Sequence, residues 1–203
     1  MPTLMQKREK DEKGVNMLRI ITGSLKGKKL YSLEGEATRP TSDRIKGAMF
    51  SSIQFDIENR KVLDLFAGTG QLGLEALSRG AASVTFVDME REAIDTVKKN
   101  ATLCGVFDRC RYSVADWRNY IRKASGRDKF DLVFIDPPYA MKCCADAVKR
   151  LCEGGLLLPG AIVVLESGEE EIDLSSEEFS AFETIKSTAY GKKTAVNILL
   201  YRT

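Results

Sequence analysis

The chain of 203 residues contains no histidine. Histidine is the side chain that most often moves protons near neutral pH, so its absence removes the usual general base. It is also the most common metal ligand in proteins. Any chemistry must therefore depend on carboxylates, backbone groups or a bound cofactor, and we expect no metal site.

Cysteine is also sparse, with five residues and no CxxC pair. Cys143 and Cys144 are adjacent, a spacing that suits neither a tetrahedral zinc site nor a disulfide framework. We interpret the cysteines as reduced, mostly buried thiols in a cytoplasmic protein.

Long apolar runs are missing too. No stretch approaches the roughly 18 residues of a membrane span. Residues 1–16, "MPTLMQKREKDEKGVN", lack the apolar core of a signal peptide. This segment is polar, charged and aperiodic, which predicts a disordered tail. The remaining composition, 43% hydrophobic and 30% charged, is that of an ordinary globular protein.

The net charge of +2 is distributed unevenly. Residues 1–50 hold 11 Lys and Arg against 6 Asp and Glu, whereas the remainder holds 20 against 23. A basic end hints at a polyanionic partner such as nucleic acid, although a charge run is more often only a solvated face.

Residues 17–60 differ in pattern from the rest of the chain. Two short apolar segments, 18–22 and 28–31, flank a turn from Gly23 to Gly27, which predicts a β-hairpin. Residues 41–43, Thr-Ser-Asp, can cap a following helix that places Ile45, Met49 and Ile53 on one face.

From residue 61 onward, strand and helix patterns alternate. We expect strands at 61–66, 83–88, 111–115, 130–135 and 161–166, and helices at 71–79, 90–103, 117–124 and 140–152. Such alternation implies a parallel sheet covered on both faces. The last stretch reads "ETIKSTAY", a Gly-Lys-Lys turn and "TAVNILLYR", which predicts an antiparallel hairpin at one edge. Residues 17–203 should form one compact α/β unit.

A glycine loop follows the first of these strands. The stretch 62–73, "VLDLFAGTGQLG", contains Gly68-x-Gly70-x-x-Gly73, and Asp88 ends the next strand. This pattern matches the dinucleotide fingerprint, in which a pyrophosphate lies on a helix N-terminus and an acid binds a ribose. An NAD-dependent dehydrogenase is therefore one interpretation.

Asp64 favours a different cofactor. It lies four residues before Gly68, where a carboxylate would repel a pyrophosphate but suit a cationic ligand without phosphate. S-adenosylmethionine, with its ammonium and sulfonium groups, is such a ligand. Asp88 can accept both ribose hydroxyls, and Asp116, after the third strand, can accept from the adenine amino group. The carboxyl ends of parallel strands meet at one edge, so these acids should line one crevice.

A fourth strand ends in the same crevice with Asp136-Pro137-Pro138-Tyr139, within "FDLVFIDPPYAM". The prolines cannot continue a ladder, since neither has an N–H to donate. An exocyclic amine on a nucleobase, or an amide, fits this end: Asp136 and the Pro137 carbonyl accept its two hydrogens while Tyr139 stacks on its plane. The Asp136 carboxylate would also stabilise positive charge that develops on the attacking nitrogen.

These motifs carry a resemblance to a known family. "VLDLFAGTG" with "IDPPY" resembles the Asp/Asn-Pro-Pro-Tyr class of amino-methyltransferases. "RIITGSLKGKKL" and "TRPTSDRIKGAMFSSI" are similar to the bacterial 16S rRNA guanine-N2 methyltransferase family, RsmD. The resemblance covers roughly residues 17–203. It implies a Rossmann-like fold with a seven-stranded sheet, S-adenosylmethionine as cofactor, and methylation of one guanine N2 in an assembled or partly assembled small ribosomal subunit.

The resemblance also implies roles for particular residues. Catalysis falls to Asp136, Pro137, Pro138 and Tyr139. The expected cofactor contacts are Arg39, Thr41, Asp64, Phe66, Gly68, Gly70, Asp88 and Asp116; the first two belong to a segment, 39–44, where related enzymes close over the methionine moiety. The expected RNA contacts are Arg19, Lys26, Lys28, Lys29, Arg44 and Lys46. Residues 17–60 would thus bind rRNA and cover the cofactor, and residues 61–203 would form the methyltransferase domain.

Two alternatives remain at this level. The Asp-Pro-Pro-Tyr motif binds an amine without specifying whose, so an adenine-N6 or cytosine-N4 methyltransferase acting on DNA or another RNA is possible. The chain could also be a non-catalytic RNA-binding protein with this fold. An intact glycine loop together with an intact Asp-Pro-Pro-Tyr argues against lost activity.

Overall fold

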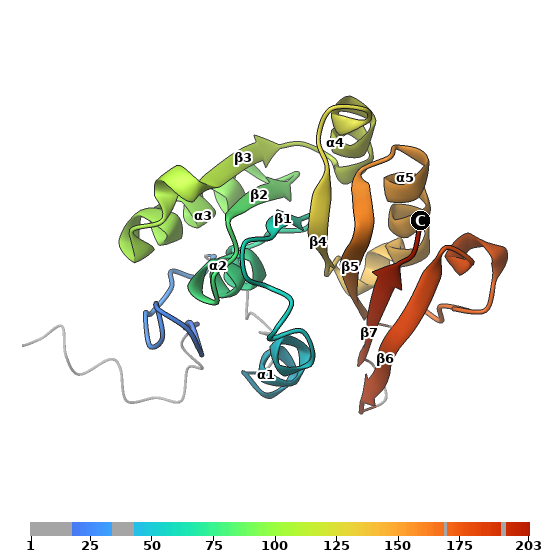
Figure 1. The fold of residues 1–203 in the computed structure, drawn as a ribbon. Coiled ribbons are helices and arrows are strands. Elements are labelled where there is room, and N and C mark those ends of the chain that lie inside the picture. Colours follow the sequence, from blue (N-terminus) through green and yellow to red (C-terminus); the bar gives the residue numbers. More distant parts are fainter. Residues whose placement is uncertain (1–17, 34–42, 169, 192–193) are drawn as a thin grey trace, which may run out of the picture.

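A computed structural model describes residues 18–33, 43–168, 170–191 and 194–203 of the chain. Seven strands form one sheet in the order β3-β2-β1-β4-β5-β7-β6 (Figure 1). The strands are β1 Lys61–Asp64, β2 Ser83–Asp88, β3 Cys110–Val114, β4 Phe130–Ile135, β5 Leu157–Ser167, β6 Phe182–Tyr190 and β7 Thr194–Tyr201. Strands β1 to β5 are parallel, and β7 runs antiparallel to both β5 and β6. The predicted fold class is confirmed.

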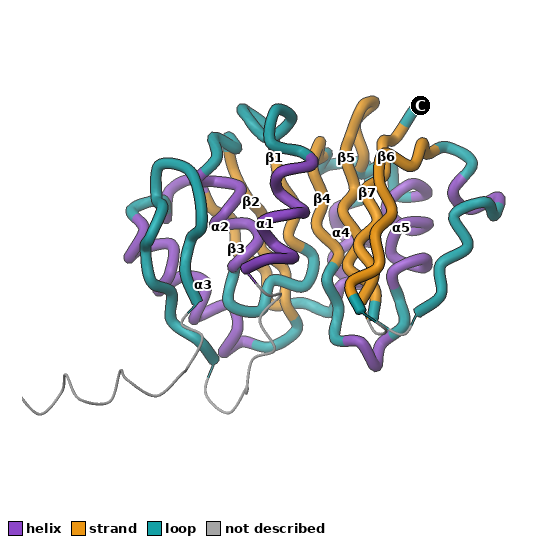
Figure 2. Tube along the Cα trace, turned by 90° about the horizontal axis from the view of Figure 1, so that it is seen from below, coloured by secondary structure: helices purple, strands orange, loops and turns teal. Residues whose placement is uncertain are grey.

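Within the described residues, five α-helices pack around this sheet (Figure 2). They are α1 Asp43–Ser52, α2 Gln71–Ser78, α3 Arg91–Cys104, α4 Trp117–Ala124 and α5 Cys144–Glu153. Alternating side chains of β4 divide the interior: Leu132 and Phe134 pack with residues of α1, α2 and α3. Val133 and Ile135 pack with residues of α4 and α5 on the opposite face. This alternation is the geometry of a strand that is buried on both faces.

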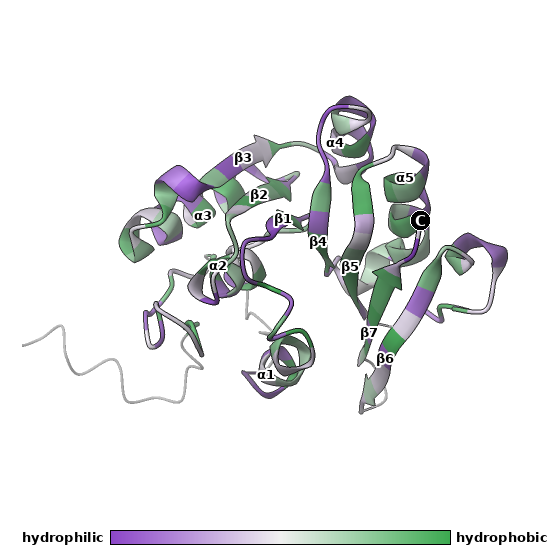
Figure 3. Cartoon of the chain, viewed as in Figure 1, coloured by the Kyte–Doolittle hydropathy of each residue, from purple (hydrophilic) through white to green (hydrophobic). Residues whose placement is uncertain are grey.

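The hydropathy of the strands agrees with their burial in the sheet. In Figure 3, strands β5 and β7 are mainly hydrophobic, whereas edge strand β6 mixes both colours. Five successive residues of β6 are exposed to solvent. No helix within the described residues has the length and apolar character needed to cross a bilayer. All five cysteines are free thiols, buried or half-buried.

The predicted helix at 140–152 is wrong at its start. Residues Tyr139–Met141 form a short 3₁₀ turn, and Lys142 takes a left-handed backbone (φ 43°), which a continuous right-handed helix cannot contain. Helix α5 begins at Cys144 instead, because Glu170 caps it from a distant loop. Its carboxylate accepts from Cys144 N at 2.9 Å and Ala145 N at 3.2 Å. A cap supplied from 26 residues away leaves no local signal in the sequence.

The N-terminal hairpin is present in minimal form. Arg19 and Lys29 make a single antiparallel bridge, flanked by Ile20 N donating to Lys28 O at 3.0 Å and Leu30 N to Leu18 O at 2.8 Å. Neither predicted segment is a full strand. The apolar side chains of this hairpin, Leu18, Ile20 and Leu30, join the same core as α1, α2 and α3.

Three polar side chains of α2 and α3 hold the hairpin in place. Buried Glu75 accepts from Ile21 N at 2.8 Å and Thr22 N at 3.0 Å. The Ser78 hydroxyl accepts from Leu25 N at 2.9 Å. Asn100 exchanges two hydrogen bonds with the backbone of Tyr31. These bonds satisfy hairpin backbone groups that its single bridge leaves unpaired.

Candidate active site

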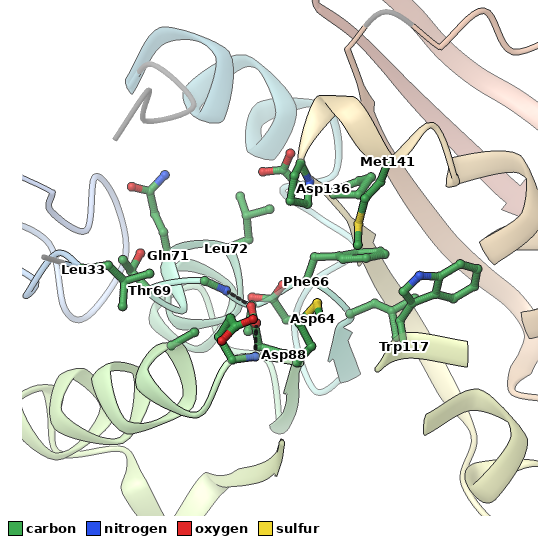
Figure 4. Close-up of a pocket in the computed structure, with 18 of the residues that line it drawn as sticks. Leu33, Asp64, Phe66, Thr69, Gln71, Leu72, Asp88, Trp117, Asp136 and Met141 are labelled. Carbon is green, nitrogen blue, oxygen red and sulfur yellow. Dashed lines mark hydrogen bonds between the residues drawn. The ribbon is translucent and has the colours of Figure 1, made fainter. Parts of the chain in front are cut away.

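A cavity of about 610 Å³ lies at the carboxyl ends of strands β1 to β5. Its lining includes an acid at the end of β1 and β2 and just after the end of β3 and β4: Asp64, Asp88, Asp116 and Asp136. Figure 4 places Asp64 and Asp88 close together beneath the glycine loop, with Asp136 nearer α1. The sequence predicted that these four carboxylates share one crevice, and the cavity unites them. Its volume lies within the usual range for small-molecule sites.

Asp88 holds the glycine loop in place through a hydrogen bond to its backbone. Gly68 and Gly70 both have left-handed backbones, with φ of 51° and 80°. Oδ2 of Asp88 accepts from Gly68 N at 2.9 Å, and Oδ1 accepts from Glu90 N at 2.9 Å. A carboxylate oxygen can accept more than one hydrogen bond, so Asp88 keeps the capacity to receive hydroxyl groups from the cavity.

Gly73, the third glycine, lets α2 approach the sheet. A Cβ at this position would lie 2.3 Å from Cε1 of Phe86 on β2, a distance that no packed pair of carbon atoms tolerates. The third glycine of the motif is therefore required for close packing of helix on strand.

Asp64 supports the loop from below. Its side chain is 2% exposed, and Oδ2 accepts from Gly73 N at 3.0 Å. Gly70 has no side chain to cap α2, so Asp64 satisfies one of the open N–H groups at this helix start. Burial raises the pKa of Asp64 to about 7, against the Gly73 hydrogen bond, which lowers it, and with the nearby Asp88 charge, which raises it further. Asp64 thus titrates near neutral pH.

Asp116 has two roles: it caps helix α4 and it lines the cavity. It caps α4, with Oδ1 accepting from Arg118 N at 3.0 Å and Asn119 N at 3.2 Å. It also lines the cavity, which leaves Oδ2 available to a donor in the site. The cap explains why the chain turns into a helix directly after β3.

The Asp-Pro-Pro-Tyr segment continues β4 into the cavity wall. Asp136, Pro137 and Pro138 all line the cavity, and Met141 N donates to Pro138 O at 2.8 Å to close the turn. Arg39, Thr41 and the side chain of Tyr139 lie outside the described residues, so their expected roles stay predictions.

Sequence reasoning missed much of the apolar wall. Met89 and Trp117 each follow a cavity acid, and Met141 follows the proline motif. The rings of Phe66 and Trp117 lie 6.0 Å apart (Figure 4). Nε1 of Trp117 is buried and has no hydrogen-bond partner among the described residues. A position directly after a strand-end acid is the signal that could have identified Met89 and Trp117.

Glu166 was also missed. It lines the same cavity and is 3% exposed. It ends the apolar run of β5, just as the four predicted acids end or follow their strands. The same rule, an acid at the carboxyl end of a parallel strand, would have included it.

Asn100 connects the glycine loop to the hairpin. Its Oδ1 accepts from Tyr31 N at 2.7 Å, and its Nδ2 donates to Tyr31 O at 3.1 Å and to Thr69 O at 2.9 Å. The side chain is fully buried. The position of the hairpin and that of the loop are therefore coupled through one amide.

The predicted RNA contacts divide into three groups. Lys26, Lys28, Lys29 and Arg44 are exposed. Arg19 is exposed but forms an ion pair with Asp43, with Nη2 and Oδ2 3.1 Å apart. The role of these five residues as RNA contacts stays a prediction.

Lys46 is a correction. Its side chain has no exposed surface, and Nζ donates to Arg19 O at 2.8 Å and lies 3.8 Å from Asp43 Oδ1. Burial lowers the pKa of its ammonium group. A buried ammonium cannot reach a phosphate, so the prediction of Lys46 as an RNA contact is wrong. It instead joins α1 to the hairpin.

The cavity suits S-adenosylmethionine on several counts. The left-handed glycines expose the loop backbone, Asp88 offers acceptors for a ribose, and Asp64 offers a negative charge for a cationic chain. Phe66, Met89 and the neighbouring Ala115 supply an apolar wall for a purine ring. No group of three metal-ligating side chains occurs within the part of the chain that the structure describes.

A parallel sheet with β7 inserted antiparallel, a clamped glycine loop and Asp-Pro-Pro-Tyr after β4 define a class. It is that of the Rossmann-like, S-adenosylmethionine-dependent methyltransferases.

Comparison with known proteins specifies the family. The family model described as conserved hypothetical protein 95 matches residues 18–199. Ribosomal RNA small subunit methyltransferase D of Haemophilus influenzae is 34% identical over 164 residues, which are 80% of this chain and 85% of that protein. The Escherichia coli protein of the same name is 34% identical over 158 residues, 77% and 78% of the two chains. The chain belongs to this family, that of RsmD.

A solved structure agrees with this placement. The Escherichia coli protein yhhF superimposes with a TM-score of 0.81 at 28% sequence identity. The match covers 92% of this chain and 98% of that one. The likeness therefore extends over both the hairpin region and the sheet.

Proposed function

We propose that this protein transfers a methyl group from S-adenosylmethionine to the exocyclic N2 amine of one guanine in 16S rRNA of the small ribosomal subunit. The observation that carries the proposal is one cavity whose lining includes Gly68 of the glycine loop together with Asp136, Pro137 and Pro138. Family membership and the names of the relatives support an rRNA substrate. The assignment of guanine N2 rests on the resemblance described above.

The loop side of the cavity holds the cofactor. Asp88 accepts the ribose hydroxyls, Asp116 the adenine amine, and Asp64 faces the cationic methionine portion. The backbone at Gly68 and Gly70 makes the close approach, and Phe66 packs on the apolar part. When bound, the cofactor supplies an electrophilic methyl group. Arg39 and Thr41 would close over the methionine end.

The proline side of the cavity receives the amine. Asp136 and the Pro137 carbonyl each accept one amine hydrogen, and Tyr139 stacks on the base. Acceptors placed out of the base plane help the nitrogen lone pair localise for an in-line attack. The Asp136 carboxylate then stabilises the positive charge that grows on nitrogen, and no histidine is required.

RNA must be held by charge from outside the cavity, since the acids that line the cavity would repel a phosphate backbone. The exposed cations of the hairpin and α1, Lys26, Lys28, Lys29 and Arg44, are suited to this. Arg19 would contribute only where an RNA phosphate displaces Asp43 from their ion pair. The substrate would be the small subunit or an assembly intermediate, in the cytoplasm. Residues 17–60 would then act as rRNA-binding element and cofactor cover, and residues 61–203 as the catalytic domain.

The experiment changes Asp136 to Ala and measures methyl transfer from labelled cofactor to unmodified small subunits. We expect a loss of about 10²–10³ in rate, the usual effect of removing one preorganised electrostatic partner. Cofactor affinity by calorimetry should stay near that of the unchanged protein. Exposed Asp108, changed to Ala, is the matched control. Near-normal turnover by Asp136→Ala would show that another residue receives the amine.

A further inference from the structure

Two carboxylates lie side by side at the amine end of the cavity. Strands β4 and β5 are parallel neighbours, and their last paired residues are Ile135 and Leu165. The next residue on each strand is Asp136 on one and Glu166 on the other. Parallel neighbours are about 4.8 Å apart, so these two acids are adjacent in the sheet.

Both acids extend toward the same face. Leu165 packs in the core on the α4 and α5 side. Val164 packs in the core on the α1, α2 and α3 side, as does Phe134 on β4. Side chains alternate along a strand, so Asp136 and Glu166 continue the Phe134 and Val164 face. Val196, the β7 partner of Glu166, lies in that same core, which agrees with this assignment.

Glu166 belongs to the cavity, yet the reaction proposed above does not use it. It lines the same space as Asp136 and is 3% exposed, whereas Asp136 is half-buried. A carboxylate in the wall next to the amine acceptor presents acceptor oxygens to a substrate that binds there.

The three bases with exocyclic amines differ in the atom next to that amine. In guanine the neighbour of N2 is N1–H, a donor. In adenine the neighbour of N6 is N1, and in cytosine the neighbour of N4 is N3; both are acceptors. An ionised carboxylate only accepts. A carboxylate beside Asp136 therefore attracts the Watson–Crick edge of guanine and repels that of adenine or cytosine.

We infer that Glu166 accepts the N1–H of the target base and so selects guanine. The inference rests on the proposed function and deepens it: Asp136 receives the amine, and Glu166 determines which base may present one. Asp136 alone cannot make this distinction, because it contacts a group that all three bases share. Glu166 is thus a specificity residue, and the guanine preference becomes a property of two neighbouring strand ends.

The test replaces the target guanine by 2-aminopurine, once the methylated position has been mapped. This base keeps the amine at C2, but its N1 is an acceptor. Small subunits are reconstituted with rRNA that carries either base, and kcat/KM is measured for both. The unchanged protein should prefer guanine by about ten- to a hundred-fold, the discrimination of one good base-edge contact.

Glu166→Gln should narrow that preference at least about tenfold, because the new amide can donate to N1 of 2-aminopurine. Its cofactor affinity should not change. Glu171→Gln, at an exposed position, is the matched control and should keep the original ratio. Glu166→Ala, which removes the acceptor without adding a donor, should bring the two bases near parity and serves if the Gln variant fails to bind cofactor.

Several results would overturn the inference. The first test needs no variant: equal kcat/KM of the wild-type protein for guanine and 2-aminopurine would refute the role of Glu166. If a folded Gln or Ala variant loses activity equally on both bases, Glu166 has only a structural role and does not select the base. Digestion of the wild-type product separates the two proposals. Absence of N2-methylguanosine refutes the proposed function and this inference together, whereas its presence with an unchanged base ratio in the variant refutes only the latter.

Discussion

The buried carboxylate of Asp64 makes a prediction whose size follows from the structure. Its pKa is raised from 3.8 to about 7, chiefly by burial. The folded protein therefore keeps a proton that the unfolded chain loses, and the free energy of unfolding falls as pH rises from about 4 to about 7. A difference of about 3 between the pKa values of the folded and unfolded states corresponds to about 4 kcal/mol at most. Above about pH 7 the loss is complete and the contribution becomes constant.

Asp64→Asn removes this titration while the amide oxygen still accepts from Gly73 N. Urea unfolding of both proteins should be compared at several pH values between about 4.5 and 7.5. The stability of the wild type relative to the variant should decline across this range by a few kcal/mol. Asp108→Asn, at an exposed position, is the control and should give a constant difference.

The same titration should appear in cofactor binding. A cation beside Asp64 favours the ionised form, so cofactor affinity of the wild type should rise with pH up to about 7, and that of Asp64→Asn should not. A stability difference that does not vary with pH would show that Asp64 is ionised throughout, and would refute the reasoning from burial.

Three further changes test other parts of the site. Asp88→Ala should weaken cofactor binding at least about tenfold by calorimetry, since two charged hydrogen bonds to a ribose are worth about 1.5–3 kcal/mol each; unchanged affinity in a folded variant would refute the assignment. Asn100→Ala should lower the free energy of unfolding by about 1–3 kcal/mol and also weaken cofactor binding, because it leaves loop and hairpin backbone groups unpaired; a stability loss without any effect on the cofactor would show that the hairpin and the loop are not coupled. Changing Lys26, Lys28 and Lys29 together to Ala should flatten the salt dependence of binding to small subunits by about 0.7–0.9 units per lost phosphate contact, and an unaltered slope would leave the hairpin as a cofactor cover only.

The sheet could be predicted from sequence because its strands are continuous apolar runs that end in acids. Strands β2 and β4 have the predicted bounds. The four cavity acids could be grouped for the same reason, since parallel strands present their carboxyl ends at one edge. Glu166 obeys the same rule and was overlooked only because it matches no known motif.

What could not be predicted depends on contacts between distant segments. Glu170 determines where α5 begins, and Glu75 and Asn100 hold the hairpin, through bonds to residues 26 to 69 positions away. The sequence predicts Lys46 as a surface cation, because a lysine on a short helix usually is one. Its burial depends on the position of the hairpin backbone, which accepts its hydrogen bond.

The central claim is that one cavity brings a methyl donor to the N2 amine of a guanine in small-subunit rRNA. The most direct measurement incubates the protein with unmodified small subunits and isotopically labelled S-adenosylmethionine, digests the rRNA to nucleosides and identifies the labelled one. The account predicts N2-methylguanosine, formed at one position of the 16S rRNA and lost with Asp136→Ala. Label in N6-methyladenosine or N4-methylcytidine, or no transfer by a protein that binds the cofactor, would contradict it.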